Sequence, residues 1–182
     1  MKHALTTAAA GMAVWTLAAC STPAMMSEMK APAAPAAVTV PAGHKVAMMT
    51  TGIGELTYEC RAKAGMPGQW EWVFTGPDAM LYDMNRKMVG KYYGGPTWEA
   101  ADGSKVGGKQ LAVAPSSNAG AIPLQLVQAG PATGSGAMSG VSYVQRLNTM
   151  GGVAPMDACG EAMSGKKKTV KYQADYVFYK PA

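Results

Sequence analysis

The sequence is short of the residues on which most enzymes and nucleic-acid-binding proteins depend. Charged residues make up 15% of the 182 positions, histidine occurs twice, cysteine occurs three times, and the net charge is +5. The cationic side chains are scattered except around residues 166–171, where we expect a solvated turn, so no nucleic-acid partner is predicted. The chain therefore has few imidazole and thiolate ligands for a zinc centre, and we predict no metal and no cofactor.

Sequence patterns of several common protein classes are incomplete or absent. Gly52 and Gly54 begin a dinucleotide-binding fingerprint, but Thr57 stands where a third glycine is needed. No CxxC pair and no repeat of 20 to 50 residues is present. The incomplete glycine fingerprint argues against nicotinamide-dependent chemistry. The absence of a repeat argues against a propeller or solenoid.

The N-terminus has the pattern of an export signal. An apolar run over residues 8–19, too short to cross a bilayer, ends in Leu-Ala-Ala-Cys at residues 17–20. This tetrapeptide resembles the bacterial lipobox, which implies that residues 1–19 are removed and that Cys20 carries the lipid. Ser21 after the cysteine then implies a lipid-anchored protein of the cell envelope, at the outer membrane and facing the periplasm. The alternative is an ordinary signal peptide with an incidental thiol.

Residues 20–41 are rich in alanine and contain four prolines, which is typical of an extended tether. We therefore predict a single domain over residues 42–182. Three methionines of the tether, Met25, Met26 and Met29, could offer thioethers to Cu(I), and metal storage or sensing is the weakest of our functional hypotheses.

Alternation with a period of two predicts the fold. In residues 56–61 the side chains of Leu56, Tyr58 and Cys60 share one face of a strand. Turn signals such as Met66-Pro67-Gly68 and Gly76-Pro77-Asp78 separate eight or nine such segments, which indicates an all-β fold. We predict a single-domain antiparallel β-sandwich or barrel with at most a short helix, near residues 156–163. The other strand candidates are residues 44–51, 70–74, 79–83, 87–93, 109–114, 122–128, 141–147 and 170–178.

Two cysteines remain once Cys20 carries a lipid. In an oxidising compartment Cys60 and Cys159 are then the only possible intramolecular pair, and we predict a disulfide between them. It would enclose nearly the whole domain. A reactive thiol or a metal pair is the alternative, although no histidine lies near either cysteine in the sequence.

The densest polar segment is residues 94–104, which include Trp98, Glu99 and Asp102. The two carboxylates could form an acid and base pair beside a sugar-stacking tryptophan, or could supply oxygen ligands to Ca²⁺. We favour a simpler interpretation, in which Asp102 caps an Asp-Gly turn through its own backbone.

A second polar cluster spans residues 145–152 and contains Arg146 and Asn148. Alternation places Arg146 on the face opposite Tyr143, either as a solvated charge or as a partner for Glu99 or Asp102. His44, the one histidine that remains after export, is interpreted as a surface strand residue.

Five short motifs follow one another along the chain: Tyr58-Glu59-Cys60, Gly95-Pro96-Thr97-Trp98-Glu99, Asp102-Gly103-Ser104, Val144-Gln145-Arg146-Leu147-Asn148-Thr149 and Tyr172-Gln173-Ala174-Asp175-Tyr176-Val177-Phe178-Tyr179. In this order they resemble a family of secreted bacterial and fungal proteins catalogued only as a domain of unknown function. The resemblance covers roughly residues 40–180 and implies an exported domain, and it supports the proposed disulfide. Some fungal relatives carry a malate dehydrogenase label, which the incomplete fingerprint does not support here. Family members often have a histidine just before the Gly-Pro-Thr-Trp-Glu motif, where this chain has Lys-Tyr-Tyr-Gly at residues 91–94. A family activity that used this imidazole would be lost here, and the simpler alternative is that the position needs only an aromatic-sized side chain that forms hydrogen bonds.

Together these observations favour a non-catalytic envelope lipoprotein that contributes a binding or structural surface. Its partner, whether a small molecule, a glycan or a protein, is not specified by the sequence beyond the membrane reached through Cys20. The alternative is a hydrolase or lyase acting on a carbohydrate through Glu99 and Asp102. Trp98, Arg146 and Asn148 are the remaining candidate site residues.

Overall fold

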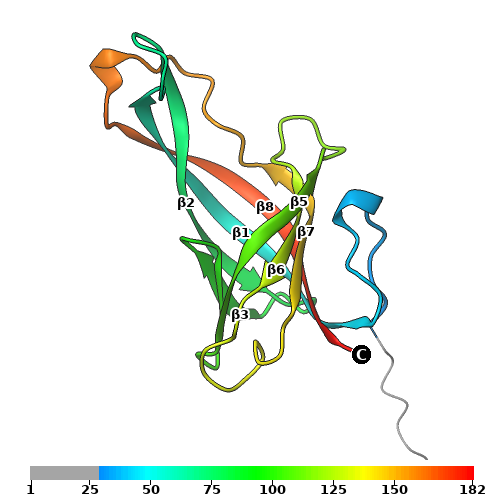
Figure 1. The fold of residues 1–182 in the computed structure, drawn as a ribbon. Helices are drawn as coiled ribbons and strands as arrows, with labels where there is room; N and C mark the ends of the chain where they lie inside the picture. Colours follow the sequence, from blue (N-terminus) through cyan, green and yellow to red (C-terminus); the bar gives the residue numbers. More distant parts are fainter. Residues whose placement is uncertain (1–28) are drawn as a thin grey trace, which may run out of the picture.

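Eight antiparallel strands form a closed barrel in which each strand pairs with the next and β8 returns to β1 (Figure 1). The structure is a computed structural model that describes residues 29–182. The all-β prediction is confirmed, and of the two expected architectures the barrel is the one that forms. Within residues 29–182, helix is limited to two 3-10 turns. The elements are η1 (Ala36–Val38), β1 (His44–Ala62), β2 (Trp70–Tyr82), β3 (Met88–Tyr93), β4 (Thr97–Ala100), β5 (Lys105–Ala114), β6 (Leu124–Ala129), β7 (Tyr143–Gly151), η2 (Glu161–Met163) and β8 (Lys167–Pro181).

Large aromatic side chains fill the inside of the barrel. The rings of Tyr92 and Trp98 stack with their centroids 4.9 Å apart, and Phe178 meets Trp98 edge to face. Gly52 makes room for this packing, because a Cβ at that position would lie 2.6 Å from the ring of Tyr176. Alternation along each strand thus sends one set of residues into a closed aromatic core.

The N-terminal segment packs against the outside of the barrel. Val38 is 0% exposed and lies in a second apolar cluster with residues of β1, β5, β6, β7 and β8. Its carbonyl oxygen accepts a hydrogen bond from Nε2 of Gln145 at 2.6 Å, and Tyr179 donates to the same glutamine at 2.6 Å. Residues 34–40, which we expected to belong to a tether, are therefore part of the packed structure, and we call them the strap. Figure 1 shows the strap in blue beside β5 and β7.

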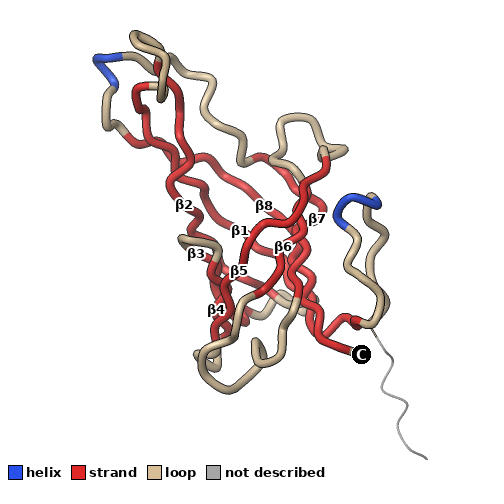
Figure 2. The backbone as a smooth tube through the Cα atoms, in the orientation of Figure 1, coloured by secondary structure: helices blue, strands red, loops and turns tan. Residues whose placement is uncertain are grey.

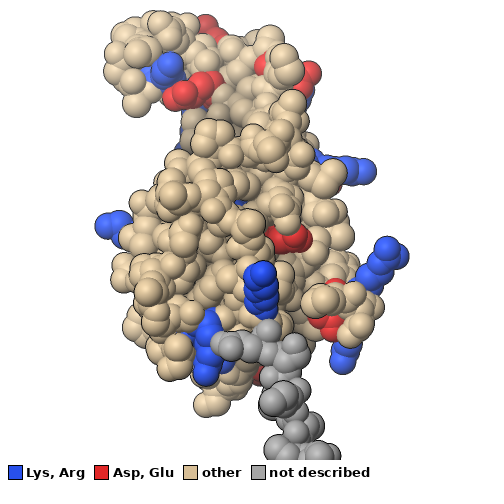
Figure 3. Space-filling model, turned by 90° about the vertical axis from the view of Figure 1, so that its right-hand side faces the viewer, with Lys and Arg blue, Asp and Glu red and all other residues tan. Residues whose placement is uncertain are grey.

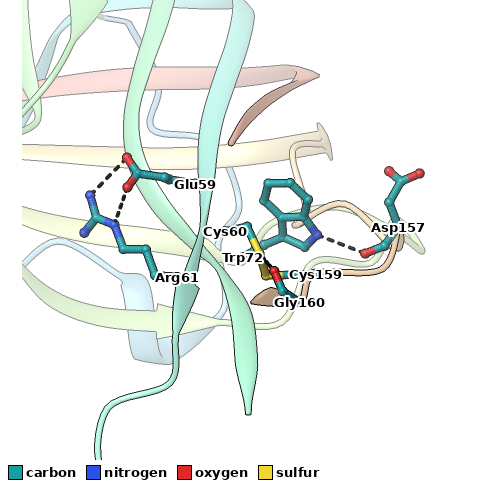
Figure 4. Close-up of a disulfide and its surroundings, with 7 residues drawn as sticks. All are labelled: Glu59, Cys60, Arg61, Trp72, Asp157, Cys159 and Gly160. Atoms are coloured by element: carbon teal, nitrogen blue, oxygen red, sulfur yellow. Dashed lines mark hydrogen bonds and ion pairs between the residues drawn. A yellow bond between two sulfur atoms is a disulfide. The ribbon is translucent and has the colours of Figure 1, made fainter. Parts of the chain in front are cut away.

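Three strands extend beyond the barrel and form a projecting arm, which we define as residues 56–62 of β1, 70–77 of β2 and 167–171 of β8 (Figure 2). The connection from β7 to β8 runs along the arm. The predicted disulfide between Cys60 and Cys159 is present, with 5.6 Å between the Cα atoms, and it ties this connection to β1 (Figure 4). Nε1 of Trp72 donates to the carbonyl oxygen of Asp157 at 3.0 Å and adds a second attachment.

One expected turn is absent. Gly76-Pro77-Asp78 lies inside β2, where Pro77 pairs with Leu56. Pairing of β2 with β3 begins only at Asp78, so Pro77 has one neighbouring strand, and a residue without a backbone N–H is tolerated there. β2 has one residue more than β1 at the point where the pairing passes from Thr57 to Tyr58, and a β-bulge accommodates it. Two of our expected strands are consequently one long strand.

Charge is distributed thinly over the surface. On the face in Figure 3 the lysine and arginine side chains lie apart from one another, with acidic side chains between several of them. The arm forms the narrow upper part of the same view. Across residues 29–182, no helix has the length and apolar character needed to cross a membrane.

Candidate functional site

A pocket of about 370 Å³ lies at the mouth of the barrel from which the arm projects. The start of the arm, the turn between β3 and β4, and strands β6 and β7 all contribute to its walls. The volume is within the range of small-molecule sites. Four apolar or aromatic residues face two polar ones across this pocket: Leu56, Phe74, Pro77 and Tyr92 on one side, and Gln125 and Arg146 on the other.

Arg146 lies on β7, on the face opposite Tyr143 as alternation predicted. That face is the inside of the barrel, because Tyr143 packs in the outer cluster, so Arg146 is not a fully solvated charge. Its Nε and Nη2 groups both donate to the carbonyl oxygen of Pro123, at 3.2 and 2.9 Å. None of the ion pairs formed within residues 29–182 includes this guanidinium. The pairing with Glu99 or Asp102 that we considered is therefore not formed, and the charge of Arg146 stays uncompensated at the pocket.

Four tyrosines inside the barrel lie close enough to Arg146 to respond to its charge. Burial raises the pKa of Tyr58, Tyr92, Tyr172 and Tyr176, and the positive charge of Arg146 opposes this rise in each case. Tyr92 also lines the pocket. The guanidinium is thus positioned between the aromatic core and the open mouth.

Gln125 is the direct cross-strand neighbour of Arg146 in the pairing of β6 with β7. Its Nε2 group donates to Oε1 of Gln110 at 2.5 Å, which leaves its own carbonyl oxygen available as an acceptor. Gln125 was not among the predicted site residues. The available signal was its inward position on the same strand face as the buried Val127, because a polar residue on an inward face needs a partner.

Phe74 and Tyr92 were also missed as pocket residues. Phe74 is 50% exposed at the rim although it belongs to an alternating apolar segment, and such exposure cannot be read from alternation alone. Tyr92 is buried, and its position in the pocket depends on how β3 lies across from β7.

Glu99 lies on the outer surface of the barrel, away from Arg146. Its carboxylate accepts a hydrogen bond from the hydroxyl of Tyr93 at 2.7 Å and pairs with Nζ of Lys105 at 3.0 Å and Nζ of Lys91 at 3.5 Å. The Tyr93 hydroxyl first, and then the two lysines, lower the pKa of Glu99. This carboxyl group is therefore held ionised, whereas a general acid needs a raised pKa.

Asp102 caps the turn between β4 and β5. Its Oδ1 accepts hydrogen bonds from the backbone N–H of Ser104 at 2.9 Å and from the Ser104 hydroxyl at 2.5 Å, and its Oδ2 accepts one from the backbone N–H of Ala137 at 2.7 Å. The Ser104 hydroxyl contributes most to a lowered pKa of Asp102. The turn interpretation is thus the one that the contacts match, and Asp102 also fastens the connection from β6 to β7, whose Met138 is buried in the core.

Trp98 and Asn148 do not line the pocket, and they lie in two different environments. Trp98 is 0% exposed inside the barrel, and its Nε1 group has no hydrogen-bond partner among the described residues. Asn148 is exposed at an irregularity of β7, has φ +48°, and donates from Nδ2 to Oδ2 of Asp175 at 2.7 Å. The five predicted site residues therefore do not meet in one cavity, and of these only Arg146 lines the pocket at the barrel mouth.

His44 begins β1 and is half-buried. Its Nδ1 lies 3.0 Å from the carbonyl oxygen of Pro41, and its ring meets Tyr143 edge to face with the centroids 4.8 Å apart. Within the described part of the chain, no group of three or more histidine, cysteine, aspartate or glutamate side chains could hold a metal ion. Cys20, Met25 and Met26 lie outside the described residues.

Comparison with known proteins adds one match. The model of the family described as "Protein of unknown function (DUF3455)" matches residues 41–180. No curated protein and no solved structure matches the chain.

Proposed function

The chain belongs to the DUF3455 family, and we propose that it is a non-catalytic, lipid-anchored domain of the bacterial cell envelope that binds a small molecule at the mouth of its barrel. One observation carries the binding part of this proposal. The pocket combines apolar walls with an arginine whose charge no carboxylate of residues 29–182 compensates. A concave apolar pocket with a few polar groups on one side is the usual form of a small-molecule site.

The anchor is proposed from the sequence. The Leu-Ala-Ala-Cys motif at residues 17–20 supports removal of the leader and lipidation of Cys20, and Ser21 supports the outer membrane, facing the periplasm. The disulfide agrees with an oxidising compartment outside the cytoplasm.

The contacts of the two candidate catalytic carboxylates favour binding over hydrolysis. Glu99 is engaged by Tyr93 and two lysines on the outer surface, and Asp102 is engaged by backbone and hydroxyl groups in a turn. Both contact sets lower the pKa, so both carboxyl groups are ionised at neutral pH and neither holds the proton that a general acid must donate.

The binding proposal is tested by filling the pocket. Gln125→Trp places a large ring among the lining residues, whereas Gln128→Trp makes the same change at an exposed position of the same strand. A set of small molecules covering neutral, anionic and cationic compounds is screened by protein NMR. We expect some of them to shift the signals of Tyr92 and Phe74 in the parent and in Gln128→Trp, and not in Gln125→Trp. If no compound in the set shifts these signals, the pocket is not a binding site and the proposal is wrong.

A further inference from the structure

We propose that the pocket at the barrel mouth selects small monocarboxylates with a flat apolar body, and that Arg146 binds the carboxylate. This inference deepens the proposed function and rests on it, because it names the ligand class for the same pocket. Three observations support it: the charge balance of the barrel, the hydrogen-bond donors of Arg146 that have no partner, and the apolar residues that line the pocket.

The charge balance gives the sign of the ligand. All five ion pairs in residues 29–182 use other cations, so the guanidinium at the mouth has no carboxylate of its own. Arg146 is also the only lysine or arginine that lines the pocket. A half-buried cation without a counter-charge gains most from an anionic group brought by a ligand.

The free donors of Arg146 indicate which anion fits. A guanidinium has five N–H donors, and the carbonyl oxygen of Pro123 accepts from two of its nitrogens, Nε and Nη2. That contact fixes the plane of the group while leaving Nη1 and one N–H of Nη2 free. Two parallel donors in a plane match the two oxygens of a carboxylate. One cation compensates one negative charge, so a doubly charged phosphate ester would keep an uncompensated charge in the pocket.

The walls indicate the body of the ligand. Phe74 and Tyr92 present aromatic surface, Leu56 and Pro77 present aliphatic surface, and the space between them is about 370 Å³. Such walls favour a flat apolar group of modest size over a sugar, which would have to lose the hydration of several hydroxyl groups. Gln125, beside Arg146, has an acceptor for one donor on that body.

The test compares matched acids and amides on the purified protein. The probes are benzoate, 3-phenylpropanoate and octanoate, each with its neutral primary amide, together with phenyl phosphate. Binding is followed by isothermal calorimetry and by the NMR signals of Phe74, Tyr92 and the Gln125 side chain. We expect benzoate or 3-phenylpropanoate to bind saturably and more tightly than octanoate, whose chain is flexible, and tightest binding of octanoate would contradict the flat body. The amide of the bound acid should bind at least about tenfold more weakly, and phenyl phosphate should bind no more tightly than the acid.

Variants assign the effect to the guanidinium. Arg146→Gln should weaken the acid about tenfold or more and leave the amide nearly unchanged, and Arg146→Lys should restore part of the loss because it keeps the charge without the planar fork. Lys109→Gln removes the same charge from an exposed position of β5 and serves as the matched control. Far-UV circular dichroism and the melting temperature establish that each variant folds.

The outcomes separate this inference from the proposed function. Equal affinity for acid and amide, or an unchanged acid affinity in folded Arg146→Gln, overturns the inference while leaving the pocket as a binding site. Tighter binding of phenyl phosphate than of any acid also overturns it. If no probe of either charge shifts the pocket signals, the inference and the proposed function are both wrong.

Discussion

Replacing Val38 by alanine should lower the free energy of unfolding by about 2–3 kcal/mol. Val38 belongs to the strap, is 0% exposed, and packs against the outer face of the barrel in one cluster with Leu147 and Val177. Losing the burial of two carbons costs about 0.8 kcal/mol for each, and the cavity left against the rigid barrel adds the remainder. The substitution keeps the carbonyl oxygen that Gln145 binds, so it isolates packing from hydrogen bonding.

Urea unfolding followed by tryptophan fluorescence measures this change. Val153→Ala is the matched control, because Val153 is 42% exposed and the same two carbons are removed from the surface. We expect the control to stay within about 0.5 kcal/mol of the parent. The dependence on urea should be the same for all three proteins, since the surface exposed on unfolding scarcely changes.

A loss in Val38→Ala no larger than that in Val153→Ala would refute the reasoning. It would mean that the strap is not docked in solution and that residues 34–40 behave as the tether that their composition first suggested. A full loss would instead establish that the folded unit begins before residue 42.

Three further predictions concern the disulfide, a carboxylate and the anchor. Cys60→Ala with Cys159→Ala opens a covalent loop of sequence separation 99, which should cost about 2–5 kcal/mol in urea unfolding, and a smaller loss would contradict the assigned role. Contacts in the folded state lower the pKa of Asp102, so as the pH falls the Asp102 carboxylate is protonated in the unfolded chain before it is protonated in the folded one. The stability that these contacts contribute is therefore present above pH about 4 and is lost as the pH is lowered further. Asp102→Asn should be less stable at neutral pH and lose less on acidification, and urea midpoints measured at several pH values check both points. Cys20→Ser should prevent incorporation of labelled palmitate and release the protein from the membrane fraction of a bacterial host, and unchanged membrane association would argue against the lipid anchor.

Alternation predicted the strands well because it reports only which side of a strand is buried. The same pattern serves a sandwich and a barrel, and the choice depends on whether β8 reaches β1, a contact between residues far apart in the sequence. Pro77 was misassigned as part of a turn, because local chemistry does not show that the pairing of β2 with β3 stops at Asp78, one residue after Pro77. The strap was missed since only Val38 and Val40 are apolar enough to signal packing.

The candidate site was harder to predict than the fold. Alternation places Arg146 on the face opposite Tyr143, but it does not show that this face is the inside of the barrel. The absence of a paired carboxylate depends on where every acidic side chain of the described residues lies in space. Glu99 and Asp102 lie close together in the sequence, and the barrel wall and the turn nevertheless give them separate roles. The register that places Gln125 beside Arg146 is set by the whole sheet and not by either segment.

Closure of the barrel leaves the body of the protein without strand edges, so a second chain cannot join it by backbone pairing there. The arm differs, because β3 does not extend along residues 70–77 of β2 and β7 does not extend along residues 167–171 of β8. On the β8 side Lys167 and Lys168 provide the positive charge that commonly protects an open edge. The unpaired edge of β2 over residues 70–77 is therefore the less protected of the two arm edges, and it lies away from the sheet that encloses the core.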